Sequence, residues 1–315
     1  MTALRVVEDA EVRRLVTGPD AVRLVEDVFR EHGEGRSPLS RPSAMALEGA
    51  GRPPTRFKVK GAALHGAGLA GFRVTANAGQ ASYCYVCDGR TGRPLGLVEE
   101  SWLHKLRTAA TAAVAVKYLA RRGARVVTLF GAGVIAGELV PLLPLALEVE
   151  ELRVLARRQA SAEGFAARHG SRMRFPVVAA GSPREAVRGA DVVVTLTEAT
   201  EPIVLPGWLE AGSLLCSMGS HHEVDIAVLD EADRFVADDL DYAMEMGDGA
   251  AWLRTGRTTR EKLAARLDAD VGQVVCGARP GRVSDRDRVL AIVQGMAIGD
   301  VALAGHVLRR AGRLP

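Results

Sequence analysis

A glycine-rich turn between an apolar strand and an apolar helix constrains the fold of this chain more than any other feature. The preceding strand is predicted at 125–130, and a second strand follows at 152–157. Between them a G-x-G-x-x-A pattern opens a helix with the residues Gly131, Ala132, Gly133, Val134, Ile135 and Ala136. A strand, a glycine turn and a helix in this order are typical of dinucleotide-binding domains. The sequence therefore predicts an α/β fold with a Rossmann doubly wound parallel sheet in mid-chain.

Each small residue of this turn is needed at its position for a physical reason. Gly131 permits a tight turn, and Gly133 leaves no side chain between the backbone and an approaching pyrophosphate. Ala136 allows the helix and the strand to pack closely, and the amino-terminal end of the helix attracts an anion. We therefore expect a dinucleotide here. The alternative is a glycine turn in an α/β protein that binds no nucleotide.

The end of the second predicted strand indicates which dinucleotide is preferred. An NAD site usually has an acidic residue there, which binds the ribose hydroxyls. This chain instead has Arg157 and Arg158. Because guanidinium groups form paired hydrogen bonds with a phosphate, we expect NADP(H) to be favoured over NAD(H). The alternative is a solvated basic turn.

Four residues at the ends of two further predicted strands are candidates for cofactor contacts. Thr195 and Thr197 lie at the end of the strand at 191–197, and Gly219 and Ser220 end the next one. The carboxyl ends of parallel strands line the cofactor crevice in such sheets, which places these residues near it. Threonines are also ordinary strand residues.

The length of 315 residues suits two domains. After the glycine turn, strands alternate with short helices, which indicates a parallel sheet covered on both faces. Upstream, 1–35 is predicted to be helical with Asp20 as a cap, 55–99 is rich in strands, and 102–122 is an alanine-rich helix. Residues 288–310 are predicted to return to helix, with close-packing positions at Gly295, Gly299 and Gly305.

Composition excludes several classes of protein. Lys and Arg number 41 against 38 Asp and Glu, so the formal charge of +3 is too small for a nucleic-acid footprint. Four cysteines in a chain of this length indicate a reducing compartment. The apolar run at 139–147 is too short for a bilayer, which takes about 20 residues, and the amino terminus lacks a secretory pattern. We expect a cytoplasmic protein with no nucleic-acid or membrane partner.

Three cations and one histidine are candidates for substrate chemistry. Lys58 and Lys60 share one face of a predicted strand, either as a solvated edge or as part of an anion site. Arg107 is flanked by small residues and could bind a carboxylate through paired hydrogen bonds, or could be an ordinary surface arginine. His221 follows a predicted strand end and is a candidate acid.

We predict no metal site. Cys84 and Cys87 have C-x-x-C spacing, but residues three apart in a strand point to opposite faces, and no second pair exists. The cluster around His221 also has no matching set of ligands elsewhere.

Five segments, in order along the chain, resemble the ornithine cyclodeaminase/mu-crystallin family. They are LRTAATAAVAVKYLA at 106–120, LFGAGVIA at 129–136, GADVVVTLTEATEPIV at 189–204, MGSHHEVD at 218–225 and GMAIGD at 295–300. The resemblance implies a Rossmann domain at 118–287. It also implies an α+β substrate-binding and dimerisation domain built from 1–117 and 288–315, and hence a homodimer.

The resemblance also implies chemistry on α-imino, α-amino or α-keto acids and assigns roles to several residues. Arg107 matches the family's arginine for the substrate carboxylate. Lys60 matches its lysine near the reacting carbon, with Lys58 as a rival. Arg41 is a second candidate for the carboxylate, and Thr108 resembles a pyrophosphate contact.

Departures from the family pattern shape the functional hypothesis. His221 stands where the cyclodeaminases carry an acidic residue for proton transfer, and the Arg157–Arg158 pair is a further difference. We therefore expect an NADP(H)-dependent ketimine reductase or amino acid dehydrogenase, with His221 as a proton relay. The alternatives are an NAD-dependent cyclodeaminase acting on ornithine or lysine, and a mu-crystallin-like binding protein without catalysis.

Overall fold

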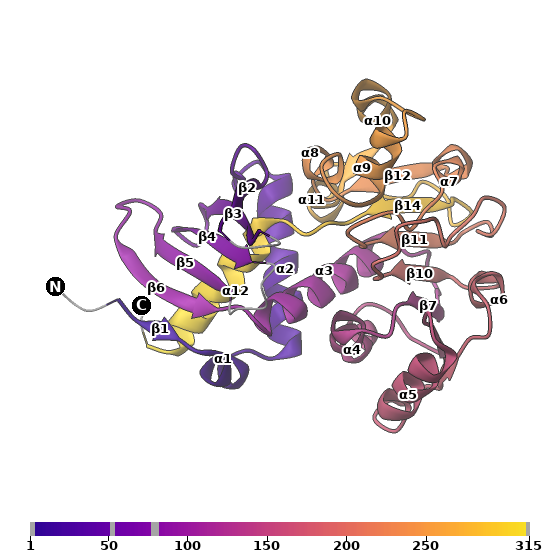
Figure 1. Ribbon diagram of the computed structural model, residues 1–315, viewed down its shortest axis with the longest axis horizontal. Coiled ribbons are helices and arrows are strands. Elements are labelled where there is room, and N and C mark those ends of the chain that lie inside the picture. Colours follow the sequence, from indigo (N-terminus) through magenta and orange to yellow (C-terminus); the bar gives the residue numbers. More distant parts are fainter. Residues whose placement is uncertain (1–3, 51–53, 77–81, 313–315) are drawn as a thin grey trace. The chain divides into compact units, whose positions relative to one another are not determined.

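The computed structural model describes residues 4–50, 54–76 and 82–312. The chain divides into two compact units (Figure 1). The first unit consists of Met1–Ala110 with Gly295–Pro315, and the second of Thr111–Gln294. No helix in the described ranges is long and apolar enough to cross a membrane.

The second unit is built on an eight-stranded sheet with the order β13-β12-β14-β11-β10-β7-β8-β9. Its strands are β7 (Val126–Phe130), β8 (Glu151–Leu155), β9 (Val177–Ala179), β10 (Val192–Thr195), β11 (Leu214–Ser217), β12 (Arg234–Ala237), β13 (Ala269–Asp270) and β14 (Val289–Ile292). Each pair of neighbouring strands is parallel. The strand order reverses at β7, the topological switch point where such sheets bind ligands. The predicted fold class is confirmed.

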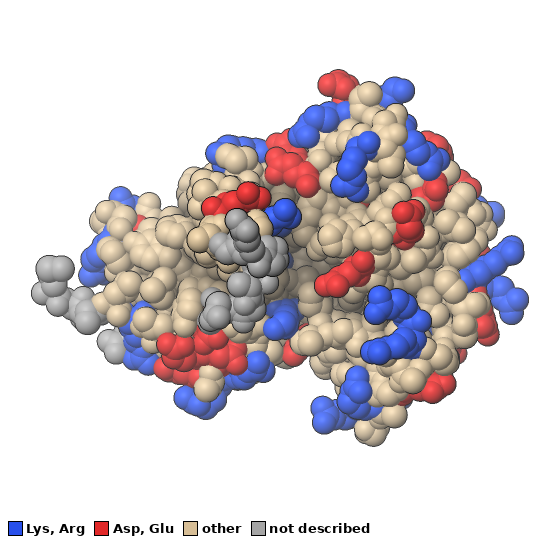
Figure 2. Space-filling view, viewed as in Figure 1, with Lys and Arg blue, Asp and Glu red and all other residues tan. Residues whose placement is uncertain are grey.

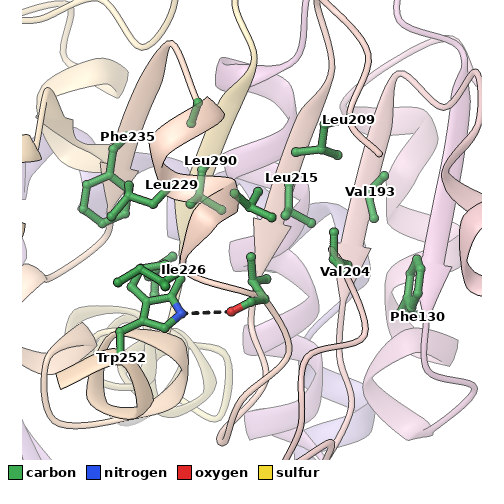
Figure 3. Packing of buried hydrophobic residues seen from close by; sticks show 14 of the residues in the cluster. Phe130, Val193, Val204, Leu209, Leu215, Ile226, Leu229, Phe235, Trp252 and Leu290 are labelled. Atoms are coloured by element: carbon green, nitrogen blue, oxygen red, sulfur yellow. Dashed lines mark hydrogen bonds between the residues drawn. The ribbon is translucent and has the colours of Figure 1, made fainter. Parts of the chain in front are cut away.

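Short helices connect these strands. They are α4 (Val134–Leu139) continued by the 3₁₀ helix η1 (Val140–Leu145), α5 (Gln159–Gly170), α6 (Pro183–Val187), α7 (Ala227–Glu231), α8 (Leu240–Ala243), α9 (Gly247–Arg254), α10 (Arg260–Arg266) and α11 (Val271–Val275). An apolar core lies between sheet and helices, and Trp252 anchors it by donating from Nε1 to the Val224 carbonyl at 2.9 Å (Figure 3). The indole thus buries its apolar body and still satisfies its one donor.

The first unit contains a six-stranded sheet with the order β1-β6-β5-β4-β3-β2. Its strands are β1 (Val6–Val7), β2 (Met45–Glu48), β3 (Arg56–Leu64), β4 (Leu69–Ala76), β5 (Tyr83–Asp88) and β6 (Pro94–Glu99). The neighbours are antiparallel except for β1 and β6.

Helices cover one face of this sheet. They are α1 (Asp9–Leu15), α2 (Gly18–Gly33) and α12 (Ala297–Arg310), and α12 packs on β3 to β6 and on α2. The helix α3 (Leu103–Leu119) begins in the first unit and ends in the second.

Two local predictions were wrong. Thr17, not Asp20, caps α2, and Asp20 occupies the third helical position, where its carboxylate accepts from the Thr17 backbone at 3.2 Å. This reciprocal arrangement is a capping box. Residues 289–292 form the buried strand β14 instead of helix. A four-residue apolar run carries no periodicity that distinguishes a buried strand from a buried helix.

Candidate functional site

The glycine turn after β7 has a backbone that only glycine adopts readily. Gly131 has a φ of +115°, and its N–H donates to the Leu155 carbonyl at 2.8 Å. A Cβ added to Gly131 would lie 2.7 Å from the Leu196 carbonyl oxygen. Both the positive φ and the contact with the end of β10 therefore require a glycine.

The next residues leave the start of α4 open. Gly133 is the N-cap of α4, and a Cβ built on it would meet no atom within 4 Å. Val134 is 60% exposed, and Ala136 is buried against the sheet. Ala132 and Ile135 are half-buried. This open backbone fits the close approach of a dinucleotide phosphate.

The two arginines expected to select the dinucleotide are exposed. Arg157 and Arg158 follow β8 after a single residue, Ala156, and Arg158 is the N-cap of α5. Elsewhere on the molecule, Figure 2 shows acidic and basic side chains interspersed over the visible face.

A buried carboxylate that sequence analysis missed lies at the ends of β10 and β11. Glu223 accepts from Thr195 Oγ1 at 2.5 Å, from both N and Oγ1 of Thr197 at 2.6 Å, and from the Gly219 backbone at 2.8 Å. A Cβ on Gly219 would lie 2.2 Å from this carboxylate. The predicted cofactor contacts Thr195, Thr197 and Gly219 therefore bind the protein's own Glu223. In the sequence, Glu223 follows two histidines, but no sequence pattern indicated which strand ends its side chain would contact.

A second buried acid supports the first. Asp248 on α9 accepts from Ser217 Oγ at 2.5 Å and from the backbone N–H groups of Glu223 and Val224 at 2.7 and 2.9 Å. Burial, aided by the nearby charge of Glu223, raises the pKa of Asp248 to about 7. Burial also raises the pKa of Glu223, although its four hydrogen bonds oppose the shift.

The loop after β11 exposes the residues that were predicted to act there. Ser220 and His221 are both exposed. His222 is half-buried, and its backbone N–H donates to the Ala199 carbonyl at 2.9 Å. Over the described ranges, no group of three or more His, Cys, Asp or Glu side chains is arranged to hold a metal ion.

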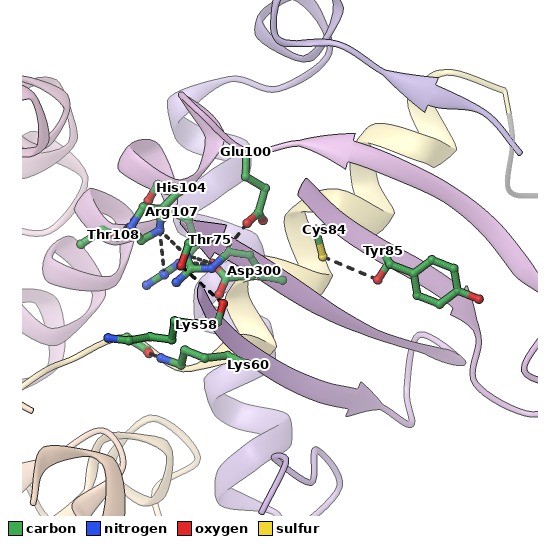
Figure 4. Close-up of polar contacts among 12 residues, drawn as sticks. Lys58, Lys60, Thr75, Cys84, Tyr85, Glu100, His104, Arg107, Thr108 and Asp300 are labelled. Atoms are coloured by element: carbon green, nitrogen blue, oxygen red, sulfur yellow. Dashed lines mark hydrogen bonds and ion pairs between the residues drawn. The ribbon is translucent and has the colours of Figure 1, made fainter. Parts of the chain in front are cut away.

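In the first unit, Arg107 lies at the centre of a buried ionic cluster (Figure 4). It is 2% exposed, and its Nε donates to Asp300 Oδ1 of α12 at 2.6 Å. A Cβ on Gly295 would lie 2.1 Å from Arg107 Nη1, and a Cβ on Gly299 would lie 3.0 Å from its Cδ. These two glycines, which were predicted as close-packing positions, make room for the arginine side chain.

Sequence analysis missed the two acids of this cluster, Asp300 and Glu100, and also Arg73 and His104. Arg73 on β4 is 5% exposed and donates to Asp300 Oδ1 at 3.4 Å. His104 Nδ1 is hydrogen-bonded to Arg73 Nη1 and, at 3.0 Å, to Arg107 Nη2. The available sequence signals were the inward position of Arg73 in β4 and the spacing of His104 one helical turn before Arg107.

The lysines of β3 point toward the same cluster (Figure 4). Lys60 is 3% exposed, pairs in register with Arg73, and donates from Nζ to the Gly295 carbonyl, while Lys58 is half-buried. They lie on one face of the strand, as expected.

The acids of the cluster respond differently to the surrounding cations. Burial alone would raise the pKa of Asp300, but Arg107, Arg73 and Lys60 outweigh it and hold that pKa below its usual value. For Glu100, burial and the charge of Asp300 raise the pKa to about 8. In the described part of the cluster, Lys60, Arg73 and Arg107 therefore surround one acid with a lowered pKa, Asp300, and one with a raised pKa, Glu100.

Arg41 and Thr108 are the two remaining predicted residues of this unit. Arg41 is exposed and precedes Pro42 through a cis peptide bond. Thr108 donates from Oγ1 to the His104 carbonyl at 2.8 Å, a local hydrogen bond within α3.

Comparison with known proteins finds both sequence relatives and solved structures that resemble this chain. An uncharacterized cyclodeaminase of Sinorhizobium fredii is 31% identical over 99% of this chain and 97% of its own. A Δ1-pyrroline-2-carboxylate reductase of Bacillus cereus is 30% identical over 71% of this chain and 69% of its own. An archaeal alanine dehydrogenase, solved as a dimer with bound NAD, superposes with a TM-score of 0.87 at 25% identity, over 98% of this chain and 96% of its own.

The family assignment rests on nearly the whole sequence. The model of the ornithine cyclodeaminase/mu-crystallin family matches residues 4–313. The match includes both the glycine turn of the second unit and the buried Arg107 of the first. The chain belongs to the ornithine cyclodeaminase/mu-crystallin family.

Proposed function

We propose that this protein is an NADP(H)-dependent reductase of small α-imino acids, which in reverse acts as an amino acid dehydrogenase. The observation that carries the proposal is the buried cluster of Lys60, Arg73 and Arg107 with an excess of positive charge. Such a cluster favours an anionic ligand, because burying unbalanced charge is costly. The relatives named as reductases and dehydrogenases act on small amino or imino acids that carry a carboxylate.

The second unit is the proposed dinucleotide-binding domain. Gly131 and Gly133 would bring the backbone close to the diphosphate, and the open start of α4 would donate N–H groups to it. Glu223 would keep Thr195, Thr197 and Gly219 in the conformation that shapes the crevice at the strand ends. When bound, the nicotinamide supplies or accepts the hydride.

Arg157 and Arg158 support the preference for NADP(H) over NAD(H). Their exposed guanidinium groups follow β8, where a ribose 2′-phosphate would be recognised. The archaeal alanine dehydrogenase was solved with NAD, so the proposed preference for NADP(H) is supported only by the two arginines of this chain.

The first unit is the proposed substrate domain. Arg107 would bind the substrate carboxylate and orient the C=N bond. In the reduction, hydride adds to the imine carbon and a proton adds to its nitrogen. Lys60 would supply that proton. His221 of the second unit is exposed and stays a candidate for proton exchange with solvent. Lys58 and Arg41 would contribute further positive charge.

The first unit also offers a surface for a homodimer. On the sheet face opposite α12, one row of cross-strand neighbours is apolar: Val6, Leu97, Tyr85 and Phe72. Phe72 is 42% exposed, and its ring centroid lies 5.0 Å from that of Tyr85. Apolar faces of this kind are typical of subunit interfaces.

The proposal is tested by a substrate screen. Purified protein is mixed with NADPH and a panel of 2-keto acids plus ammonia or methylamine, and separately with cyclic ketimines. Stoichiometric loss of absorbance from NADPH supports the reductase. Release of ammonia from ornithine or lysine with no net change in NADH or NADPH would instead establish the cyclodeaminase named among the relatives.

A further inference from the structure

Two arginines from different elements of the first unit are bridged by the same pair of acceptors. Arg73 from β4 and Arg107 from α3 both donate to Nδ1 of His104, the latter from Nη2 at 3.0 Å. Both also donate to Asp300 Oδ1, at 3.4 and 2.6 Å. His104 and Asp300 thus hold the two guanidinium groups beside one another. Figure 4 shows Arg107 with these two acceptors.

These donors define the protonation state of the imidazole. A guanidinium group has N–H donors and no acceptor. His104 Nδ1 must therefore present its lone pair to the arginines, which places the ring proton on Nε2 and leaves the imidazole neutral. A protonated imidazole would direct an N–H at two other N–H groups. The hydrogen-bonded arrangement exists only with neutral His104.

We propose that His104 is a positioning residue that aligns Arg73 and Arg107 as a two-guanidinium site for the carboxylate of the substrate. The proposal rests on the proposed function, in which Arg107 binds that carboxylate. Two guanidinium groups at close range repel one another, and a neutral acceptor between them reduces this repulsion without supplying the negative charge that the substrate brings. Asp300 neutralises part of the charge, and His104 sets the geometry.

The charged groups around His104 make the site sensitive to acid. Arg73 faces it from β4, Lys60 from β3, Arg107 and Lys105 from α3, and Asp300 and Glu100 lie in the same cluster. Burial, followed by the four cations, holds the pKa of His104 well below its usual value. Carboxylate affinity is therefore expected to persist through neutral pH and to fall only in acid, when the imidazole gains a proton.

The experiment compares His104→Asn with His104→Leu. An asparagine amide oxygen can replace the Nδ1 acceptor and does not titrate, whereas leucine fills similar space without an acceptor. Calorimetric titration with pyruvate measures carboxylate affinity without turnover. We expect about tenfold weaker binding for His104→Leu and less than threefold for His104→Asn. The wild type should also lose affinity in acid, and His104→Asn should not.

A spectroscopic measurement reads the tautomer of His104 in the wild type and uses His104→Asn only to assign its signal. In ¹⁵N-histidine-labelled wild type, the signal missing from His104→Asn should show the Nε2–H tautomer at neutral pH. An Nδ1–H tautomer, equal weakening by both substitutions, or no pyruvate binding to the wild type would each overturn the proposal. Failure of the reductase hypothesis would show separately, as absent NADPH consumption with these binding results intact.

Discussion

The two units of this protein bury carboxylates in opposite environments. In the first unit, Asp300 accepts from the guanidinium groups of Arg73 and Arg107. In the second, Glu223 accepts only neutral donors among its described partners: two threonine hydroxyls and two backbone N–H groups, at the ends of β10 and β11. The first arrangement pairs unlike charges, and the second surrounds a charge with dipoles.

The difference indicates what each cluster can do. Arginine-rich surroundings leave an excess of positive charge, and this excess becomes most favourable when an anion enters. A carboxylate surrounded by neutral donors satisfies its own hydrogen bonds and holds two loops in one conformation. We infer that the cluster around Arg107 serves to bind an anionic ligand. The hydrogen bonds of Glu223 instead serve to fix the conformation of the strand ends of β10 and β11 in the second unit. Four predictions follow from this contrast.

The largest effect is expected for Arg107→Ala. Removing this guanidinium eliminates the strongest contact of Asp300 and the proposed carboxylate ligand. The KM for a carboxylate substrate should rise by about a hundredfold, as expected for the loss of a charged hydrogen-bonded pair. Steady-state kinetics with NADPH would measure it, with Arg13→Ala on the exposed side of α1 as a control. An unchanged KM would remove Arg107 from the site.

The next effect is expected for Glu223→Gln. Both oxygens of Glu223 accept hydrogen bonds, so a glutamine amide must direct an NH₂ group at one pair of its donors. We expect a loss of about 2–3 kcal/mol in unfolding free energy, measured by urea denaturation. Pyruvate affinity in the folded variant should remain within about twofold, a margin well below the loss of one hydrogen bond. A stable variant with a specific loss of substrate affinity would contradict the division of roles.

A third prediction concerns exposed cations, in contrast to the buried ones. Arg157→Asp combined with Arg158→Ala should shift the ratio of kcat/KM from NADPH toward NADH by about tenfold or more, because the 2′-phosphate loses its partners. Unfolding free energy should change little, since both side chains are exposed. The same ratio in variant and wild type would show that these arginines form a solvated turn.

The smallest effect is a pH dependence of stability. Asp248 has a pKa of about 7 in the folded protein and a lower one when unfolded, so the folded state holds the extra proton between those values. Stability from this group should therefore be highest in acid and decrease as pH rises toward 7. Asp248→Asn, whose amide can accept the two backbone N–H groups and donate to Ser217 Oγ, should flatten this decrease. Identical pH profiles of thermal melting would disprove the assignment.

Much of the fold was predictable from local patterns. Gly131 has a positive φ, which backbone sterics allow readily only for glycine. The glycine turn could therefore be recognised in the sequence, and its position between a strand and a helix predicted the parallel sheet. The strand β14 was missed because four apolar residues fit a buried strand and a buried helix equally well.

The candidate site was only partly predictable. Arg107 and Lys60 were identified from their sequence surroundings and from the resemblance to a family. Their partners Arg73, His104 and Asp300 were not, although a period-two or helical spacing placed each on an inward face. Long-range ion pairs depend on which elements pack together, and no local pattern encodes that.

The sequence by itself determined the glycine turn, the parallel α/β sheet and the family, because these follow from backbone sterics and short motifs. Only the tertiary structure decided which charges share a cluster. Packing α12 against β3 and β4 places Asp300 next to two arginines that lie 227 and 193 residues away along the chain. In that buried setting, proximity and desolvation, rather than residue type, decide whether a carboxyl group is charged and which cation is available to a substrate.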